Sequence, residues 1–152
     1  MKIDIEKILC ATDFSTSAER AFQYALTLAD RYGATVELLH VTEVSAYAED
    51  NVGEAENSYE GRLRARLDEI VASTDTDVSI ETRMAAGVPY AEIINRAKAM
   101  PADLIVIGTH GRTGMKHLLI GSVAEKVVRT ASCPVLSVRH PDHDVAIEGT
   151  EV

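Results

Sequence analysis

Residues 108–122, GTHGRTGMKHLLIGS, carry the residue types in this chain that most directly suggest chemistry. Four glycines, two histidines, Arg112 and Lys116 fall within these fifteen positions, directly after the apolar run DLIVI. Glycines let a backbone approach an anion closely, and a positive φ at such positions turns N–H groups inward. Three uses fit these residues: a plain turn, a metal-binding loop, or a cradle for phosphate.

Two well-known nucleotide motifs do not describe this segment. A Walker A loop requires Lys and a hydroxyl residue directly after its last glycine, and Gly114 is not followed by them. The dinucleotide pattern G-x-G-x-x-G is also absent. The spacing is instead Gly108, two residues, Gly111, nine residues, then Gly121 and Ser122. Because a helix is predicted to follow, its N-terminal N–H groups and dipole would favour an anion.

The residues alone leave structural and functional interpretations open. Residues 122–125, SVAE, form a capping box, so Ser122 is equally expected to cap its own helix. Asp13 fits either a turn or cap residue before the first helix or a site residue. Arg112 fits either a phosphate partner or an exposed charge. His110 and His117 have no carboxylate between them, which argues against direct metal ligation.

Strand-like and helix-like segments alternate along the chain. Apolar or alternating runs predict strands at residues 6–13, 35–41, 77–84, 103–108 and 133–138. Helices are predicted from the capping box TSAE at residues 16–19 to a stop at Gly33, around Leu63, from Pro89 to about Met100, and from Ser122. This alternation predicts a single α/β domain with a doubly wound parallel sheet and helices on both faces.

A sheet of this kind also predicts where a ligand binds. Ligands lie beyond the carboxyl ends of the strands, where the winding direction reverses. The ends of the first and fourth strands, and therefore Asp13 and Gly108, are expected to lie close together. Residues 43–57 are acidic and aperiodic and are expected to form a surface loop.

Composition narrows the function classes. The chain has 152 residues, 46% of them hydrophobic, which suits one domain at residues 1–140, and residues 141–152 form an acidic tail expected to be flexible. A net charge of −9 argues against nucleic-acid binding. No apolar run reaches the roughly 18 residues of a membrane span, and the N-terminal residues do not resemble a signal peptide. A cytoplasmic protein is expected.

The spacing of Gly108, Gly111, Gly121 and Ser122 resembles the ATP-binding signature of the universal stress protein family. The resemblance extends over nearly the whole chain. ILCATDFSTSAERAFQYALTLA resembles the first strand and helix of the family, VELLHV its second strand, and GVPYAEII the start of its third helix. ADLIVIGTHGRTGMKHLLIGSVAEKVVRTASCPVLSVR resembles its C-terminal third.

This resemblance implies a five-stranded sheet of order 3-2-1-4-5 and a homodimer formed through the last strand, residues 134–139. It implies that Thr12 and Asp13 lie beside the adenosine and that the main chain of Val41 reads the adenine edge. The family commonly has Pro where Ala11 stands, and the contact there is mostly through the backbone. The complete set of expected nucleotide-binding residues is Ala11, Thr12, Asp13, Val41, Gly108, Thr109, His110, Gly111, Arg112, Gly121, Ser122 and Val123.

The expected function is binding of ATP, or AMP, by a stress-response protein that acts as a nucleotide-dependent switch or interaction module. Mg²⁺ or Mn²⁺ is expected to be held through the phosphates, with no metal ligand from the protein. One alternative is a slow ATPase, for which Asp13 and Arg112 are the nearby candidates. Another is a dimeric interaction protein that binds no nucleotide. No catalytic residue is assigned, a dedicated enzyme is not expected, and the protein partners are unidentified.

Overall fold

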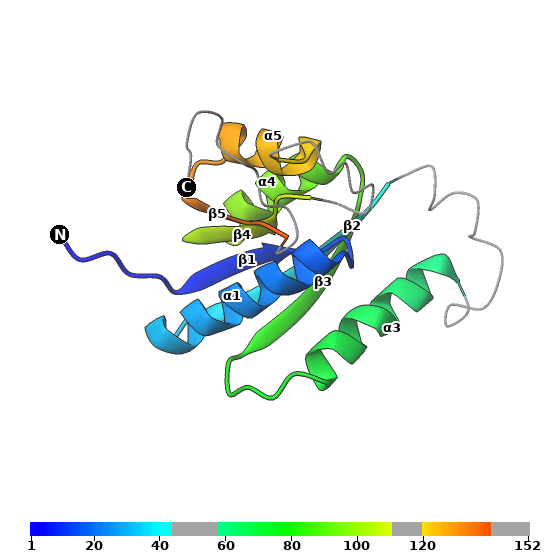
Figure 1. Ribbon diagram of the computed structural model, residues 1–152, viewed down its shortest axis with the longest axis horizontal. Helices are drawn as coiled ribbons and strands as arrows, with labels where there is room; N and C mark the ends of the chain where they lie inside the picture. Colours follow the sequence, from blue (N-terminus) through cyan, green and yellow to red (C-terminus); the bar gives the residue numbers. More distant parts are fainter. Residues whose placement is uncertain (44–57, 111–119, 141–152) are drawn as a thin grey trace, which may run out of the picture.

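The computed structural model describes residues 1–43, 58–110 and 120–140. In chain order these form β1 (Lys7–Ala11), α1 (Thr16–Tyr32), β2 (Thr35–Thr42), α3 (Tyr59–Ala72), β3 (Ile80–Ala86), α4 (Pro89–Ala99), β4 (Leu104–Gly108), α5 (Ser122–Thr130) and β5 (Val135–Val138). The strands build one parallel sheet in the order β3-β2-β1-β4-β5 (Figure 1). The predicted fold class and strand order are confirmed. The predictions for the loop after residue 43 and for the tail fall outside the described residues.

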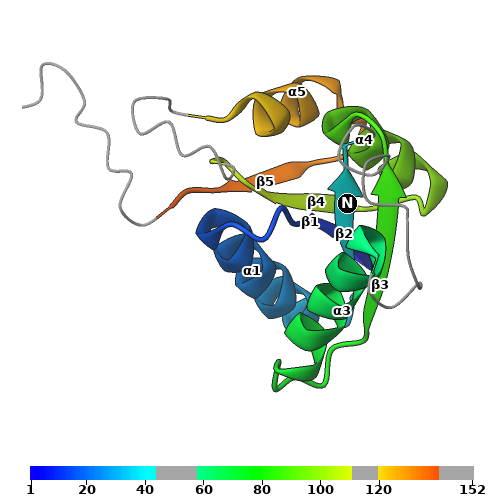
Figure 2. The same ribbon diagram turned by 90° about the vertical axis from the view of Figure 1, so that its right-hand side faces the viewer.

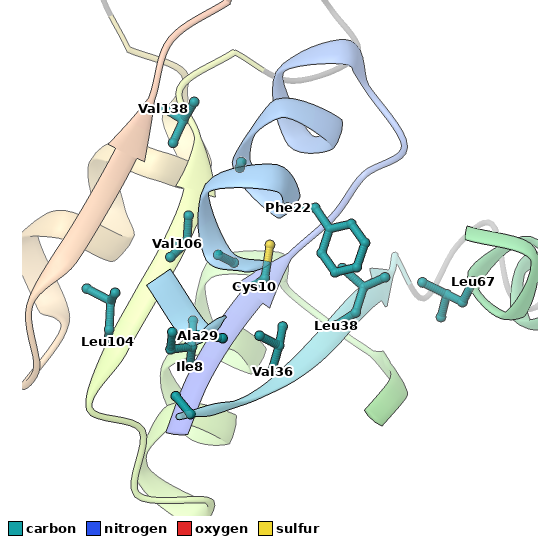
Figure 3. Packing of buried hydrophobic residues seen from close by; sticks show 13 residues of the cluster. Ile8, Cys10, Phe22, Ala29, Val36, Leu38, Leu67, Leu104, Val106 and Val138 are labelled. Carbon is teal, nitrogen blue, oxygen red and sulfur yellow. The ribbon is translucent and has the colours of Figure 1, made fainter. Parts of the chain in front are cut away.

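The sheet lies between two layers of helices (Figure 2). Helices α1 and α3 cover one face, and α4 and α5 cover the other. Each face of the sheet has its own hydrophobic core. The side chains of β1 point alternately into the two cores, so that Ile8 packs on the α1 side and Leu9 on the α4 side. Figure 3 shows the α1 core, in which Phe22 lies beside Leu38 among mostly aliphatic side chains. None of the described helices is both long and apolar enough to cross a membrane.

Helix α1 begins one residue earlier than the capping box predicted. Its N-cap is Ser15, whose hydroxyl accepts a hydrogen bond from the Ala18 N–H at 3.2 Å, and Thr16 is the first helical residue. The sequence offers hydroxyl side chains at 15, 16 and 17, each able to cap. Ser17 is already used, because its Oγ donates to the Val138 carbonyl at 3.2 Å. Gly33, with φ of 69°, ends the helix as predicted.

The predicted capping role of Ser122 is also wrong by one residue. Gly121 is the N-cap of α5, with extended φ of −72° and ψ of 162°, and Ser122 is the first helical residue. The Gly121 N–H donates to the Thr109 carbonyl, and this bond holds Gly121 outside the helix. Helix α5 therefore starts without a side-chain cap.

A carboxylate is buried on the α4 side of the sheet. Glu37 of β2, with a side chain only 4% exposed, accepts from Arg96 Nε at 2.6 Å and from Arg83 Nε at 3.0 Å. Burial acts to raise the pKa of Glu37, but the hydrogen bonds and charges of Arg96 and Arg83 outweigh it and hold that pKa below its ordinary value. The cluster keeps the carboxylate ionised and ties α4 to the edge strand β3.

Replacing Arg96 with Met should lower the free energy of unfolding by about 3 kcal/mol, because Glu37 would stay buried with Arg83 alone. Arg129→Met is the matched control, since its pair with Glu125 is largely exposed and should contribute less than about 0.5 kcal/mol. Denaturant unfolding measures both variants. Equal losses in the two would contradict a buried role for the Glu37 cluster.

The cluster also predicts a dependence on pH. Because the pKa of Glu37 is lowered by folding, its stabilisation is complete above the pKa of the unfolded carboxyl and is lost as the pH falls through the folded pKa. The stability difference between the wild type and Glu37→Gln should therefore shrink toward acid pH. A difference that is constant from pH 7 to strongly acid conditions would contradict this assignment.

Candidate functional site

The strands of the sheet end at different heights, which leaves a hollow at their carboxyl ends. Strand β1 pairs with β2 only as far as Ala11 and Leu39, and the chain then turns into α1. Strand β2 continues to Thr42 beside β3. A cavity of about 480 Å³ opens at this point, a volume typical of small-molecule sites. Because β1 and β4 are neighbours with connections in opposite directions, this is the place where the winding reverses.

The cavity brings together most of the residues predicted for the site. Its lining includes Ala11, Thr12, Asp13, Val41, Gly108, His110, Gly121, Ser122 and Val123. Thr109 is not in the lining; it is buried, and its Oγ1 lies 2.8 Å from Nδ1 of His110. Gly111 and Arg112 lie outside the described residues.

The main chain of Val41 faces the side of β2 where β1 has ended. Odd-numbered residues of β2 point their N–H and C=O groups toward β1, since the Leu39 carbonyl accepts from the Thr12 N–H at 2.8 Å. Val41 is the next residue in this series, but the ladder with β1 stops at Leu39. Its N–H and C=O therefore form an adjacent donor and acceptor that no strand pairs.

The turn after β1 is held by its own side chains. The Phe14 N–H donates to Thr12 Oγ1 at 3.1 Å, and the Ser15 N–H donates to Asp13 Oδ1 at 3.0 Å. Phe14 itself has φ of 65°, which is strained for a bulky residue. Asp13 thus acts as a turn residue, as one interpretation of the sequence expected, and it also lines the cavity.

Gly108 is glycine for a reason that the sequence did not suggest. A Cβ at this position would lie 2.8 Å from the Ser17 carbonyl carbon and 3.0 Å from the Ala18 nitrogen, in the first turn of α1. Positive φ was expected for the glycines of this segment. That expectation is wrong for Gly121, which is extended, and within the described residues the glycines with positive φ are Gly33 and Gly87. Gly108 instead allows β4 and α1 to approach closely.

Helix α5 directs its N-terminus toward the cavity. Gly121, Ser122, Val123 and Ala124 all belong to the lining. Because the N-cap makes no side-chain hydrogen bond, the first-turn N–H groups and the positive end of the helix dipole are available to an anion. This end of the cavity is suited to a phosphate or carboxylate.

Sequence reasoning missed the apolar wall of the cavity. Leu39 and Ile107 contribute from the strands, Pro89 and Ile93 from the first two turns of α4, and Tyr59 from the start of α3. A signal existed for α4, because the helix that starts at Pro89 follows a strand ending at the same sheet edge. No comparable signal pointed to Tyr59, which follows a long aperiodic segment.

Among the residues that the structure describes, those lining the cavity include two carboxylates and neither Lys nor Arg. Asp13 and Glu43 border the cavity. Across the described ranges, no three or more His, Cys, Asp or Glu side chains are grouped so as to hold a metal ion. A ligand here would be held mainly by main-chain groups and a helix N-terminus. A phosphate ligand would also need a cation from elsewhere, for which Arg112 or a bound metal ion is suitable.

Known proteins resemble this chain over most of its length. The family model described as the Universal stress protein family matches residues 4–139. Universal stress protein MJ0531 of Methanocaldococcus jannaschii is 38% identical over 145 residues, which cover 90% of this chain and 83% of that protein. The solved structure of MJ0577 has a TM-score of 0.75 and 31% identity, and the match covers 90% of this chain and 96% of the other.

A further solved structure is a universal stress protein in complex with cAMP. It has a TM-score of 0.63 and 26% identity, and the match covers 88% of this chain and 97% of that chain. The family match, the sequence relatives and the shared sheet order agree with one another. The chain belongs to the universal stress protein family.

Proposed function

We propose that this protein binds an adenine nucleotide, ATP in particular, and acts as a nucleotide-dependent switch or interaction module. One observation carries the proposal: a single cavity borders both the open main-chain edge of Val41 and the uncapped N-terminus of α5 at Gly121. The first can read a base, and the second can hold a phosphate. A nucleotide is the ligand class that needs both at once.

Adenine suits the Val41 end of the cavity. Its Watson–Crick edge presents an amino donor beside a ring-nitrogen acceptor, which matches the C=O and N–H of one strand residue. Leu39, Pro89 and Ile93 offer apolar surface to the faces of the ring. Asp13 would accept hydrogen bonds from the ribose hydroxyls, with Thr12 beside it and Ala11 in contact through its backbone.

The phosphates would lie at the α5 end. Gly121, Ser122 and Val123 would bind phosphate oxygens through main-chain N–H groups. Gly108 and Gly111 would line the ribose and phosphates, with Thr109, His110 and Arg112 completing the segment. Mg²⁺ or Mn²⁺ would be held by the phosphates and would offset their charge next to Asp13 and Glu43. The switch would act through residues 108–122, which join β4 to α5.

The relative solved with cAMP supports adenine recognition on this fold. The phosphate of cAMP is a cyclic diester, so that ligand does not distinguish ATP from AMP here. A cytoplasmic location, as expected from the sequence, would give the site access to ATP.

The purified protein should release ATP or AMP on denaturation, and added ATP should raise its melting temperature. Gly121→Val should weaken ATP binding by about tenfold or more, because its branched side chain would stand where the phosphate approaches the α5 amides. The extended backbone of Gly121 accepts Val without strain, so the variant should fold. Calorimetry measures the affinity.

Ala131→Val is the control for Gly121→Val. Ala131 is also extended and lies at the opposite end of α5, so a valine introduced there leaves the cavity unchanged. It should bind ATP as the wild type does. Wild-type affinity in a folded Gly121→Val would contradict the phosphate site, and absence of any bound nucleotide or thermal shift would favour an interaction protein without nucleotide.

Slow ATP hydrolysis is the second candidate function, favoured by the Asp13 carboxylate in the cavity lining. Because the described lining has no Lys or Arg to stabilise a γ-phosphate, release should not exceed the order of 10⁻³ s⁻¹. Asp13→Asn removes the charge but keeps the oxygen that accepts from Ser15. Phosphate release that is faster than this and is abolished by Asp13→Asn would favour the ATPase over the switch.

We also propose a homodimer that forms through β5. The Pro134 carbonyl accepts from Ile105 in β4, and the Val138 carbonyl accepts from Thr109 directly after β4. The intervening residue Ser137 therefore directs its N–H and C=O away from β4, toward the open edge of the sheet. An unpaired edge of this kind pairs readily with a second copy.

Ser137→Pro removes one outward N–H and leaves the bonds to β4 in place, so it should convert a dimer to a monomer. Ser137→Ala keeps the N–H and should remain dimeric. Light scattering after size-exclusion chromatography measures the mass, and thermal unfolding checks that the sheet is retained. A monomeric wild type, or a Ser137→Pro dimer of unchanged stability, would rule out pairing through β5.

A further inference from the structure

The carbonyl of Thr12 has an unusual partner at the end of β1. It lies 2.8 Å from Nδ1 of His40, a residue that is only 6% exposed. A carbonyl oxygen can only accept, so Nδ1 of His40 carries the proton in this contact. A side chain of β2 therefore bonds to the backbone of the neighbouring chain segment.

This contact occupies the position of the next bond in the parallel ladder. The Leu39 carbonyl accepts from the Thr12 N–H, which is the last backbone bond between the two segments. In a regular parallel ladder the following bond would run from the Val41 N–H to the Thr12 carbonyl. The backbone bond from the Val41 N–H to the Thr12 carbonyl is not made, and the His40 ring bonds to that carbonyl instead, so the Val41 N–H is left for another partner.

The His40 ring is the end of a stack of three side chains. The Phe14 ring lies against it, with centroids 4.6 Å apart. The guanidinium of Arg66, on α3, lies 4.3 Å from the centre of the Phe14 ring. Phe14 keeps its strained φ of 65° within this stack, and such strain persists only where the surroundings enforce it. The stack connects α3, the turn after β1 and the end of β2.

We propose that His40 is a positioning residue for base recognition, since it bonds to the Thr12 carbonyl and so keeps the Val41 N–H open to the ligand. The inference rests on the proposed nucleotide site. Phe14 fixes the plane of the imidazole, and Arg66 holds Phe14. His40 acts through the backbone, so its effect should be confined to the base and should not extend to the phosphates at α5.

The test compares ATP with inosine triphosphate, which has a carbonyl in place of the adenine amino group and the same triphosphate. Inosine also carries a hydrogen on the ring nitrogen that accepts in adenine, so both bonds to Val41 are lost and wild-type protein should prefer ATP by about 100-fold, the worth of two well-formed hydrogen bonds. His40→Leu frees the Thr12 carbonyl for the Val41 N–H and should reduce this preference to about tenfold, because the Val41 carbonyl still accepts from the adenine amino group. His40→Asn has an amide nitrogen as many bonds from Cβ as Nδ1 and should restore the preference.

Val36→Ala is the control for general destabilisation. Val36 is buried on the same face of β2 at its opposite end, so this variant should lose stability and keep the ATP preference. Failure of the wild type to bind either nucleotide would refute the nucleotide site itself. A wild type that discriminates and a His40→Leu variant that discriminates equally would refute the role of His40 alone.

Amide hydrogen exchange gives a second readout that needs no variant. In the free protein the Val41 amide should exchange at least about tenfold faster than the ladder-bonded Leu39 amide, and ATP should slow it. Equal protection of Val41 and Leu39 without ligand would overturn the proposal, because the Val41 N–H would then already be bonded.

Discussion

The early end of β1 is the constraint on which the rest of the site depends. The strand is central, yet the chain leaves it at Ala11 to enter α1, whose first turn packs so closely on β4 that Gly108 has no room for a side chain. Ser17 in that turn bonds to the carbonyl of Val138 at the end of β5. This packing fixes where β1 stops, and the hollow beyond it is where the cavity forms.

A site of this kind is built mainly from main chain. The open edge of Val41 and the first turn of α5 supply donors and an acceptor whose positions are set by the sheet and helix. Such groups carry partial charges only, which is consistent with an acidic chain of net charge −9 that accommodates an anion locally. Asp13 then helps to place the backbone through the turn that it holds, and the absence of a side chain at Gly108 does so by letting α1 pack closely on β4.

The fold could be predicted from the sequence because the apolar runs and helix signals alternate cleanly, and the strand order followed from the family resemblance. The site was predictable to the extent that it lies at strand ends, as for Asp13 and Gly108. What could not be predicted depends on tertiary contacts. The cap is Ser15 and not Thr16, and of the neighbouring hydroxyl residues Ser17 bonds instead to the distant strand β5, a contact that no local pattern reveals.

The same limit applies to the reason for Gly108 and to the position of Tyr59. The clash that forbids a side chain at Gly108 comes from a helix some 90 residues earlier in the chain. Tyr59 borders the cavity because α3 packs on the sheet against β3, a contact between elements that are distant from the rest of the site in sequence. Sequence periodicity describes one element at a time and gives no information about contacts between distant elements.

The most direct test of a shared base and phosphate cavity is an NMR titration of the backbone amides with ATP. Val41 and Val123 lie at its two ends, so their resonances should shift together and saturate at one ATP concentration. Leu104, at the opposite end of the sheet, should not shift. Shifts at Val123 alone, or saturation of the two amides at different concentrations, would contradict a single nucleotide site.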